Sequence, residues 1–191
     1  MAPVRSSGSV LDAGEVSRRT FVTALGLVIP AASIGMASAA TASPPAEATR
    51  PVVHQPGQEV FRSIRAEDID WKPFAAFPAA ARLAVLVGRP SEPGPYVVRV
   101  KVPDGTKLMP HRHPEDRVYT VMSGVFYIGL GDAFDADRLH AYAPGTVLVL
   151  PGNTSHFHWA RSGEYVTQVS GIGPLGITYV DAKDDPRNAG Q

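Results

Sequence analysis

The feature that most constrains the fold is an alternating run from Tyr96 to Val102, in which every second residue is apolar. Side chains two apart on an extended chain point to the same face, so this run predicts a half-buried β-strand. Shorter apolar runs, separated by turns that contain Gly or Pro, stand at 83–87, 117–122, 125–130, 146–150, 156–159, 164–170 and 175–180. Regularly spaced short strands predict an all-β barrel or sandwich.

Two pairs of histidines accompany these runs. His111 and His113 stand two apart, and so do His156 and His158. Two imidazoles on one face of an extended chain can hold one cation, and three or more convergent imidazoles suit a divalent transition metal. The same parity adds three side chains to the face of the first pair, namely Arg117, Tyr119 and Val121.

The stretches around these histidines resemble the two motifs of the cupin superfamily. The first motif reads Gly-x5-His-x-His-x3,4-Glu-x6-Gly, and the second reads Gly-x5-Pro-x-Gly-x2-His-x3-Asn. The chain matches the first at Gly105, His111, His113 and Gly124, and the second at Gly145, Pro151 and His156. It departs from them at three positions, where Arg117 replaces the usual Glu, Asn153 a Gly and Ala160 an Asn.

The resemblance implies a single-domain cupin double-stranded β-helix, a jelly-roll-like barrel, over residues 79–181. It also implies a metal held by His111, His113 and His156, with coordination positions left open for water or substrate. The metal would be a divalent transition metal, with Fe, Mn, Zn, Ni and Cu all open. The motifs constrain the activity much less, because cupins include oxygenases, isomerases, storage proteins and ligand sensors.

Arg117 is the departure with the largest chemical consequence. Without the carboxylate, three neutral imidazoles and a divalent ion leave an excess of positive charge, which is unfavourable in a low-dielectric cavity. On one hypothesis, the planar guanidinium of Arg117 binds a substrate carboxylate or phosphate. Some thiol-oxidising cupins, which use three histidines and an arginine, offer an analogy for it. On the other hypothesis, Glu115 or Asp116 pairs with Arg117 or reaches the metal instead.

Further side chains are candidates for the site around the metal. Arg117, Tyr119 and His158 are the candidate catalytic residues, and His158 is expected close to the metal rather than bound to it. Tyr119, Phe126 and Trp159 are candidates for lining the pocket, although aromatic residues in barrels more often serve packing. The pocket is therefore expected to combine imidazole, phenol and guanidinium groups.

The N-terminal part of the chain predicts export. Residues 1–42 contain Arg18 and Arg19, then a weakly apolar run and small residues suited to cleavage, which resembles a twin-arginine signal. Residues 43–78 are expected to form a Pro-rich linker, in which His54 is solvated, and an irregular arm whose aromatic side chains pack on the barrel. We therefore expect a periplasmic or secreted protein with no membrane anchor after cleavage.

Composition excludes several classes of function. The formal net charge is zero and the sequence pI is about 7.0, which argues against a nucleic-acid partner. The absence of Cys excludes disulfides, a thiol nucleophile and thiolate metal ligands. An acidic loop at 131–138 lacks the ligand spacing of an EF-hand, so it is expected to be solvated together with His140. Residues 182–191 are expected to be a polar tail.

These expectations favour a small exported metal-dependent cupin enzyme, a dioxygenase-type oxidoreductase that acts on a small, anionic molecule. The alternative is a non-catalytic periplasmic binding or sensing module, in which the barrel holds a ligand or a metal without chemistry. A sugar isomerase or epimerase is a third reading, but no acid–base spacing supports it. A small-molecule ligand is the expected partner, and a homodimer stays open.

Overall fold

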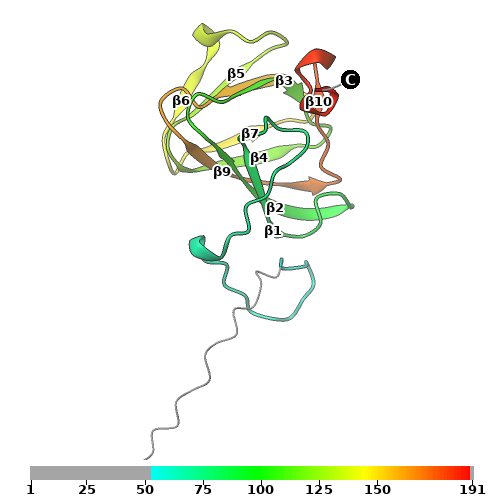
Figure 1. The fold of residues 1–191 in the computed structure, drawn as a ribbon. Helices are drawn as coiled ribbons and strands as arrows, with labels where there is room; N and C mark the ends of the chain where they lie inside the picture. The colour runs from blue at the N-terminus through cyan, green and yellow to red at the C-terminus, as the bar shows by residue number, and fades with distance from the viewer. Residues whose placement is uncertain (1–52, 190–191) are drawn as a thin grey trace, which may run out of the picture. The chain divides into compact units, whose positions relative to one another are not determined.

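The computed structural model describes residues 53–189, which form two antiparallel sheets that face each other (Figure 1). The strand order is β1-β2-β9-β4-β7 in the first sheet and β10-β3-β8-β5-β6 in the second. Consecutive strands such as β3 and β4 lie in different sheets, so the chain winds back and forth around a common interior. The predicted all-β fold class is confirmed.

The strands are short, as the turn-rich sequence predicts. The first sheet consists of β1 (Arg82–Val87), β2 (Gly94–Val102), β9 (Tyr165–Gly173), β4 (Arg117–Ser123) and β7 (Val147–Leu150). The second consists of β10 (Thr178–Tyr179), β3 (Lys107–Arg112), β8 (His156–Trp159), β5 (Phe126–Leu130) and β6 (His140–Tyr142). The helices of residues 53–189 are the 3₁₀ turns η1 (Ala66–Asp68), η2 (Ala136–Arg138), η3 (Ala182–Asp184) and η4 (Pro186–Asn188). None of these described helices has the length and apolar character needed to cross a bilayer.

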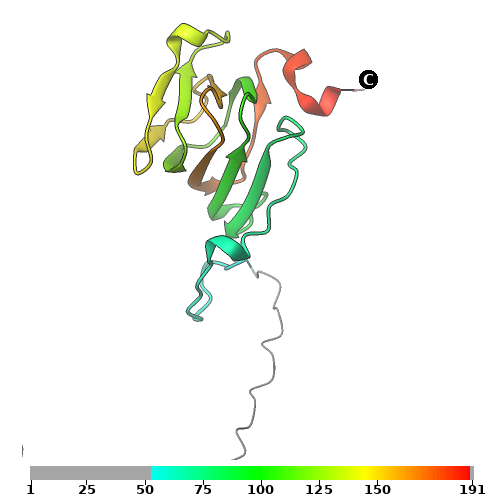
Figure 2. The ribbon, with the colours of Figure 1, turned by 60° about the vertical axis from the view of Figure 1, so that its left-hand side comes forward.

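Two strands have no counterpart in the sequence prediction, and a third is shorter than predicted. β3 contains Pro110, which lacks a backbone N–H, and its pairing with β8 shifts register between Leu108 and His111. β6 has only three residues, too few to show a period. The run predicted at 175–180 forms a strand only at Thr178–Tyr179. The C-terminal 3₁₀ turns, red in Figure 2, follow this strand and lie within the predicted polar tail.

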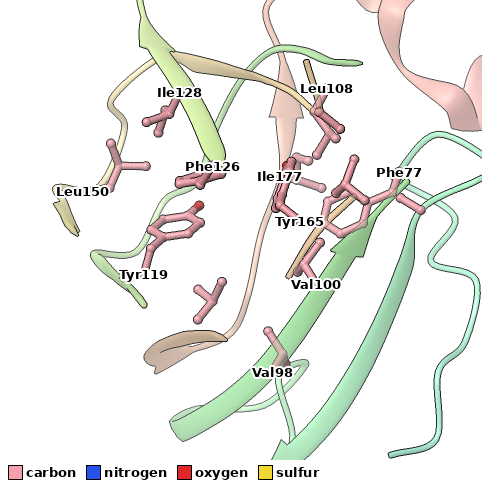
Figure 3. Packing of buried hydrophobic residues seen from close by; sticks show 14 of the residues in the cluster. Phe77, Val98, Val100, Leu108, Tyr119, Phe126, Ile128, Leu150, Tyr165 and Ile177 are labelled. Carbon is pink, nitrogen blue, oxygen red and sulfur yellow. The ribbon is translucent and has the colours of Figure 1, made fainter. Parts of the chain in front are cut away.

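The core lies between the two sheets (Figure 3). Every second residue of β2 is buried, as the alternation predicts, and Val98 and Val102 are 1% and 0% exposed. From other strands, Tyr119 and Phe126 stack with their ring centroids 5.7 Å apart. Each large apolar side chain buried in this way contributes about 1.5–3 kcal/mol, so the core holds the two sheets together. The site described below lies within this packed interior.

The N-terminal arm packs on the barrel through its aromatic residues, as expected. Phe77 belongs to the core, and Phe74 packs against it with ring centroids 4.9 Å apart. The hydroxyl of Tyr179 on β10 donates to the carbonyl of Ala76 at 2.8 Å, which ties the arm to the second sheet. The arm therefore covers one part of the barrel interior.

His54 was expected in a solvated linker, but the structure places it against β1. Its backbone N–H donates to the carbonyl of Leu86 at 3.2 Å, and its carbonyl accepts from Gly88 N–H at 2.7 Å. The side chain of His54 is only partly exposed. The predicted signal and cleavage region at 1–42, and the start of the predicted linker, lie outside the described residues.

Several motif positions have backbones in the left-handed region, and two of them explain the choice of residue. Gly124 has φ +69°, and a Cβ there would collide with the backbone of Glu164. Asn153, which stands where the motif usually has Gly, has φ 59°. Asn is among the few residues other than Gly that adopt this conformation readily. The replacement at Asn153 therefore preserves the turn that leads into β8.

Candidate metal centre

Three of the predicted ligands meet inside the barrel. His111 lies on β3 directly opposite His156, the first residue of β8, and His113 follows the end of β3. The three side chains are 1%, 0% and 3% exposed, in that order. One nitrogen from each ring lies within 4.8 Å of the others. The antiparallel pairing of β3 with β8 thus brings together residues from two distant motifs.

Backbone carbonyls orient all three rings. The Nδ1 atom of His111 lies 2.7 Å from the carbonyl oxygen of Met109, and that of His156 lies 2.9 Å from the carbonyl oxygen of Thr154. The Nδ1 atom of His113 lies 2.6 Å from the carbonyl oxygen of a distant residue, Gly176. A carbonyl can only accept, so each Nδ1 carries the proton and each Nε2 keeps its lone pair.

The free Nε2 atoms fit a metal ion. The Nε2 atom of His156 is buried and has no hydrogen-bond partner within the described part of the chain. Buried polar atoms almost always have a partner, so an unpaired lone pair next to two other imidazoles fits a nitrogen that would bind a metal ion. Neutral imidazoles suit Zn, Cu, Fe and Ni better than Mn, which prefers oxygen ligands, and a buried group of three histidines could hold such an ion.

The electrostatics keep these imidazoles neutral. Burial lowers the pKa of His156 to about 4, with a smaller contribution from the positive charge of Arg117 and against the opposing effect of the hydrogen bond to Thr154. Burial also lowers the pKa of His111 and of His113, helped by neighbouring imidazoles and by Arg117. A metal must compete with a proton for the ring nitrogen, so a lowered pKa favours metal binding at neutral pH.

His158 lies beside the three histidines without joining them. Its ring centroid is 5.0 Å from that of His156 and 5.5 Å from that of His111, and its side chain is 5% exposed. Its Nδ1 atom lies 3.4 Å from the hydroxyl of Tyr165, while its Nε2 atom is buried without a partner among residues 53–189. The structure thus leaves one more unsatisfied nitrogen next to the candidate ligands.

Arg117 points inward, as the parity predicts, and is 4% exposed. Its Nε and Nη2 atoms donate to Oε1 of Glu115 at 2.9 and 2.6 Å. The hydroxyl of Tyr96 donates to the same oxygen at 2.8 Å, and Gly176 N–H donates to Oε2 at 3.2 Å. Of the two hypotheses for Arg117, the structure shows the ion pair with Glu115.

A small interior cavity lies between several of the side chains described above. It has a volume of about 10 Å³, which is close to the smallest cavity that holds one water molecule. A separate surface pocket of about 650 Å³ lies outside it and shares His113 as part of its wall. The residues around the interior cavity include His111, His113, His158, Arg117, Tyr119 and Thr167.

The structure brings most of the candidate residues together, but two of the three candidates for lining the pocket do not line the interior cavity. Tyr119 lines the cavity, whereas Phe126 packs behind it, against His158 at 4.8 Å between ring centroids. Trp159 does not line the cavity; the ammonium of Lys107 lies 4.7 Å from its ring centroid. Side chains alternate along β8, so the residue after His158 faces outward.

Sequence reasoning missed two members of the site. Tyr96 was assigned to the core by its alternation, but its hydroxyl binds Glu115. Gly176 was not singled out, because its contribution comes from backbone atoms that carry no sequence signal. His140 is exposed, as expected, although it lies on β6.

Comparisons with known proteins support the fold. No protein-family model and no curated protein matches the sequence. Among solved structures, the polyketide cyclase RemF from Streptomyces resistomycificus has a TM-score of 0.56 and 16% identity, over 67% of this chain and 91% of that chain. An RmlC-like cupin protein from Ralstonia eutropha has a TM-score of 0.49 and 19% identity, over 65% of this chain and 74% of that chain.

A cupin 2 conserved barrel domain protein from Rhodopseudomonas palustris is similar at a TM-score of 0.48 and 16% identity, over 61% of this chain and 80% of that chain. At these identities the similarity concerns the fold alone, and of these three structures only RemF, with a TM-score above 0.5, supports it. The two facing antiparallel sheets, with both motif stretches meeting in the interior, show that residues 53–189 have the cupin fold.

Proposed function

We propose that the protein is an exported metal-dependent enzyme, a dioxygenase-type oxidoreductase that acts on a small, anionic molecule. The observation that carries the proposal is the convergence of three buried, neutral imidazoles inside the barrel, each with its Nδ1 proton on a backbone carbonyl and its Nε2 lone pair free. His111, His113 and His156 would hold the metal. Such an ion would supply Lewis-acid or redox chemistry at this point.

The charge balance of the site supports an anionic substrate. Arg117 and Glu115 form an ion pair that is neutral as a whole. The three candidate ligands are neutral too, so nothing in this group compensates a divalent ion. An uncompensated charge in a low-dielectric interior attracts an anion, which a carboxylate, thiolate or phenolate group provides.

Three side chains of the cavity have roles in this proposal. His158 has a buried Nε2 atom without a partner, so it can donate or accept a proton at a bound molecule. Tyr119 lines the same cavity and offers a hydroxyl group. Arg117 also lines it, and it would orient an anionic group while Glu115 holds the guanidinium in place.

The size of the cavity favours a second candidate function. At about 10 Å³ the interior has no room for an organic molecule as it stands. A binding or sensing module needs only the metal or a very small ligand, so it fits this volume directly. The enzyme needs the wall near His113 to move, so that a molecule from the surface pocket of about 650 Å³ can reach the metal ligands.

Metal analysis and oxygen uptake test the proposal together. Protein prepared without chelator should contain one transition metal per chain, and it should consume oxygen with at least one member of a panel of small acids, thiols and phenols. His156→Ala should lose both properties. Stoichiometric metal without turnover of any member of the panel would favour the binding module. Protein without stoichiometric metal would reject the metal-dependent enzyme and leave only a module that binds a small ligand.

A further inference from the structure

The three candidate ligands are not oriented in the same way. His111 and His156 each bond through Nδ1 to the carbonyl two residues earlier in their own stretch, Met109 and Thr154. His113 instead bonds to Gly176, which is 63 residues away in the sequence. The orientation of His113 therefore depends on the position of a distant loop, whereas the other two rings are oriented locally.

The loop around Gly176 is held by the ion pair that replaces the usual metal carboxylate. Gly176 N–H donates to Oε2 of Glu115 at 3.2 Å, and its carbonyl oxygen accepts from Nη2 of Arg117 at 3.3 Å. The same carbonyl oxygen accepts from Nδ1 of His113 at 2.6 Å. The carbonyl oxygen of Gly176 is thus shared by Arg117 and His113, and the N–H of the same residue is held by Glu115.

Both carboxylate oxygens of Glu115 accept hydrogen bonds in this role. Its Oε1 atom accepts from Arg117 and Tyr96, and its Oε2 atom accepts from Gly176. The side chains of Glu115 and Arg117 are 9% and 5% exposed, so water does not compete strongly for these bonds. A carboxylate with these donors is not free to bind a metal directly.

We infer that Glu115 and Arg117 are positioning residues for the metal centre, which act on His113 through the backbone of Gly176. The ion pair holds the backbone of Gly176 in place. The carbonyl oxygen of Gly176 in turn keeps the proton of His113 on Nδ1, so that the Nε2 lone pair of His113 points toward the other two candidate ligands. Groups that orient metal ligands in this way typically change metal affinity by about 10–100-fold when they are removed. The inference rests on the proposed metal site.

A double substitution separates positioning from charge and from stability. Glu115→Leu/Arg117→Met removes both charges at once, so the net charge of the site does not change. Buried ion pairs replaced by apolar residues of similar size commonly leave stability unchanged or improve it. Positioning predicts that this variant folds but binds Co²⁺ about 10–100-fold more weakly, with an altered visible spectrum. Glu115→Gln/Arg117→Met, which keeps an acceptor for Gly176 N–H, should bind with intermediate affinity.

The chain offers a matched control. Asp185 and Arg187 are also two residues apart, and Nη2 of Arg187 donates to the carbonyl oxygen of Ile177, the residue after Gly176. The side-chain hydrogen bonds of Asp185 and Arg187 go to each other and to Ile177, and not to His111, His113 or His156. Asp185→Asn/Arg187→Met should therefore leave Co²⁺ affinity and the Co²⁺ spectrum at wild-type values.

A measurement on the metal-free protein keeps the inference separate from the proposed function. Imidazole ¹⁵N NMR should show His111, His113 and His156 all protonated on Nδ1 in the wild type. In Glu115→Leu/Arg117→Met only His113 should become a mixture of tautomers. This result would support positioning even if the wild type bound no Co²⁺, an outcome that would reject the proposed function alone.

Two results would overturn the inference. One is an unchanged His113 tautomer in the folded double variant, whatever its Co²⁺ affinity, because the route through Gly176 would then not exist. The other applies if the double variant does not fold: Tyr96→Phe, which removes one donor to Glu115, should then weaken Co²⁺ binding and speed hydrogen exchange at the Gly176 amide. Wild-type values for both in Tyr96→Phe would reject positioning.

Discussion

Arg117 and Glu115 form a buried ion pair, in which Nη2 of the arginine lies 2.6 Å from Oε1 of the glutamate. Arg117 stands where a cupin motif usually has a metal-binding Glu, and Glu115 stands two residues earlier. Compared with the motif, the carboxylate thus pairs with an arginine instead of standing at the position of a metal ligand. The candidate metal centre consequently consists of three imidazoles without a carboxylate.

Removing a candidate ligand should remove the metal. We expect His111→Ala and His156→Ala each to lose stoichiometric metal and to unfold at a lower temperature than the loaded wild type. A ligand present at 100 times its Kd stabilises the native state by about 2.7 kcal/mol, and this contribution would be lost. His140→Ala, at an exposed position, is the matched control and should change neither quantity. Full metal content in His156→Ala would contradict the assignment.

Restoring the motif glutamate should have opposite effects on metal affinity and on stability. Arg117→Glu adds a carboxylate beside the histidines, so metal should bind more tightly. The same change leaves Glu115 buried beside a like charge, which should destabilise the metal-free variant by about 3–5 kcal/mol. Chelator competition and thermal unfolding with and without metal measure the two effects. Arg112→Glu, at an exposed position, is the control, and unchanged stability of Arg117→Glu would mean that the buried pair does not form in solution.

The metal-free protein should lose stability on acidification from about pH 6.5 toward pH 4. In the unfolded chain His156 takes up a proton near its ordinary pKa of 6.5, whereas burial lowers its pKa in the folded protein to about 4. The folded state therefore binds fewer protons over this range, and its free energy of unfolding falls as pH decreases. At about 1.4 kcal/mol per pH unit, His156 alone accounts for about 3 kcal/mol.

Chemical denaturation of chelator-treated protein at several pH values measures this loss. Between pH 6.5 and 4 the free energy of unfolding should fall less steeply in His156→Gln, because this variant has no imidazole at position 156 to protonate. Equal slopes in the variant and the wild type would contradict the buried, neutral state of this ring.

Asn153 should tolerate Gly but not a β-branched residue. Its φ of 59° lies in the left-handed region, and its backbone N–H donates to the carbonyl of His113 at 2.6 Å. Asn153→Val should destabilise the protein by about 1–2 kcal/mol or more, whereas Asn153→Gly should be close to neutral. Equilibrium unfolding of both variants measures the difference, and a Val variant as stable as the Gly variant would argue against this backbone conformation.

Export should depend on the paired arginines. Residues 1–42 resemble a twin-arginine signal, a pathway that carries folded proteins, so the metal site could be loaded before export. Arg18→Lys/Arg19→Lys should leave the precursor in the cytoplasm, which cell fractionation with immunoblotting would detect. Arg5→Lys, outside the predicted signal motif, is the control. Normal export of the double variant would reject this pathway.

The sequence by itself determined most of the strands and the positions of the candidate ligands, because both depend on local pattern. Alternation along 96–102 predicted the buried face of β2, and motif spacing singled out His111, His113 and His156. Parity also predicted that Arg117 points inward. The missed strand β3 shows the limit of local pattern, because Pro110 interrupts the run that its neighbours complete.

Only the tertiary structure decided what surrounds the ligands. Glu115 meets Tyr96 over a separation of 19 residues and Gly176 over 61, and His113 meets Gly176 over 63. Contacts of this kind depend on how two sheets face each other and on where a loop crosses between them, and the contacts at Gly176 are made by backbone atoms that are the same in every residue. Residue identity and spacing therefore predicted a group of metal ligands, whereas the packing of distant segments decided the partner of Arg117 and the support of His113.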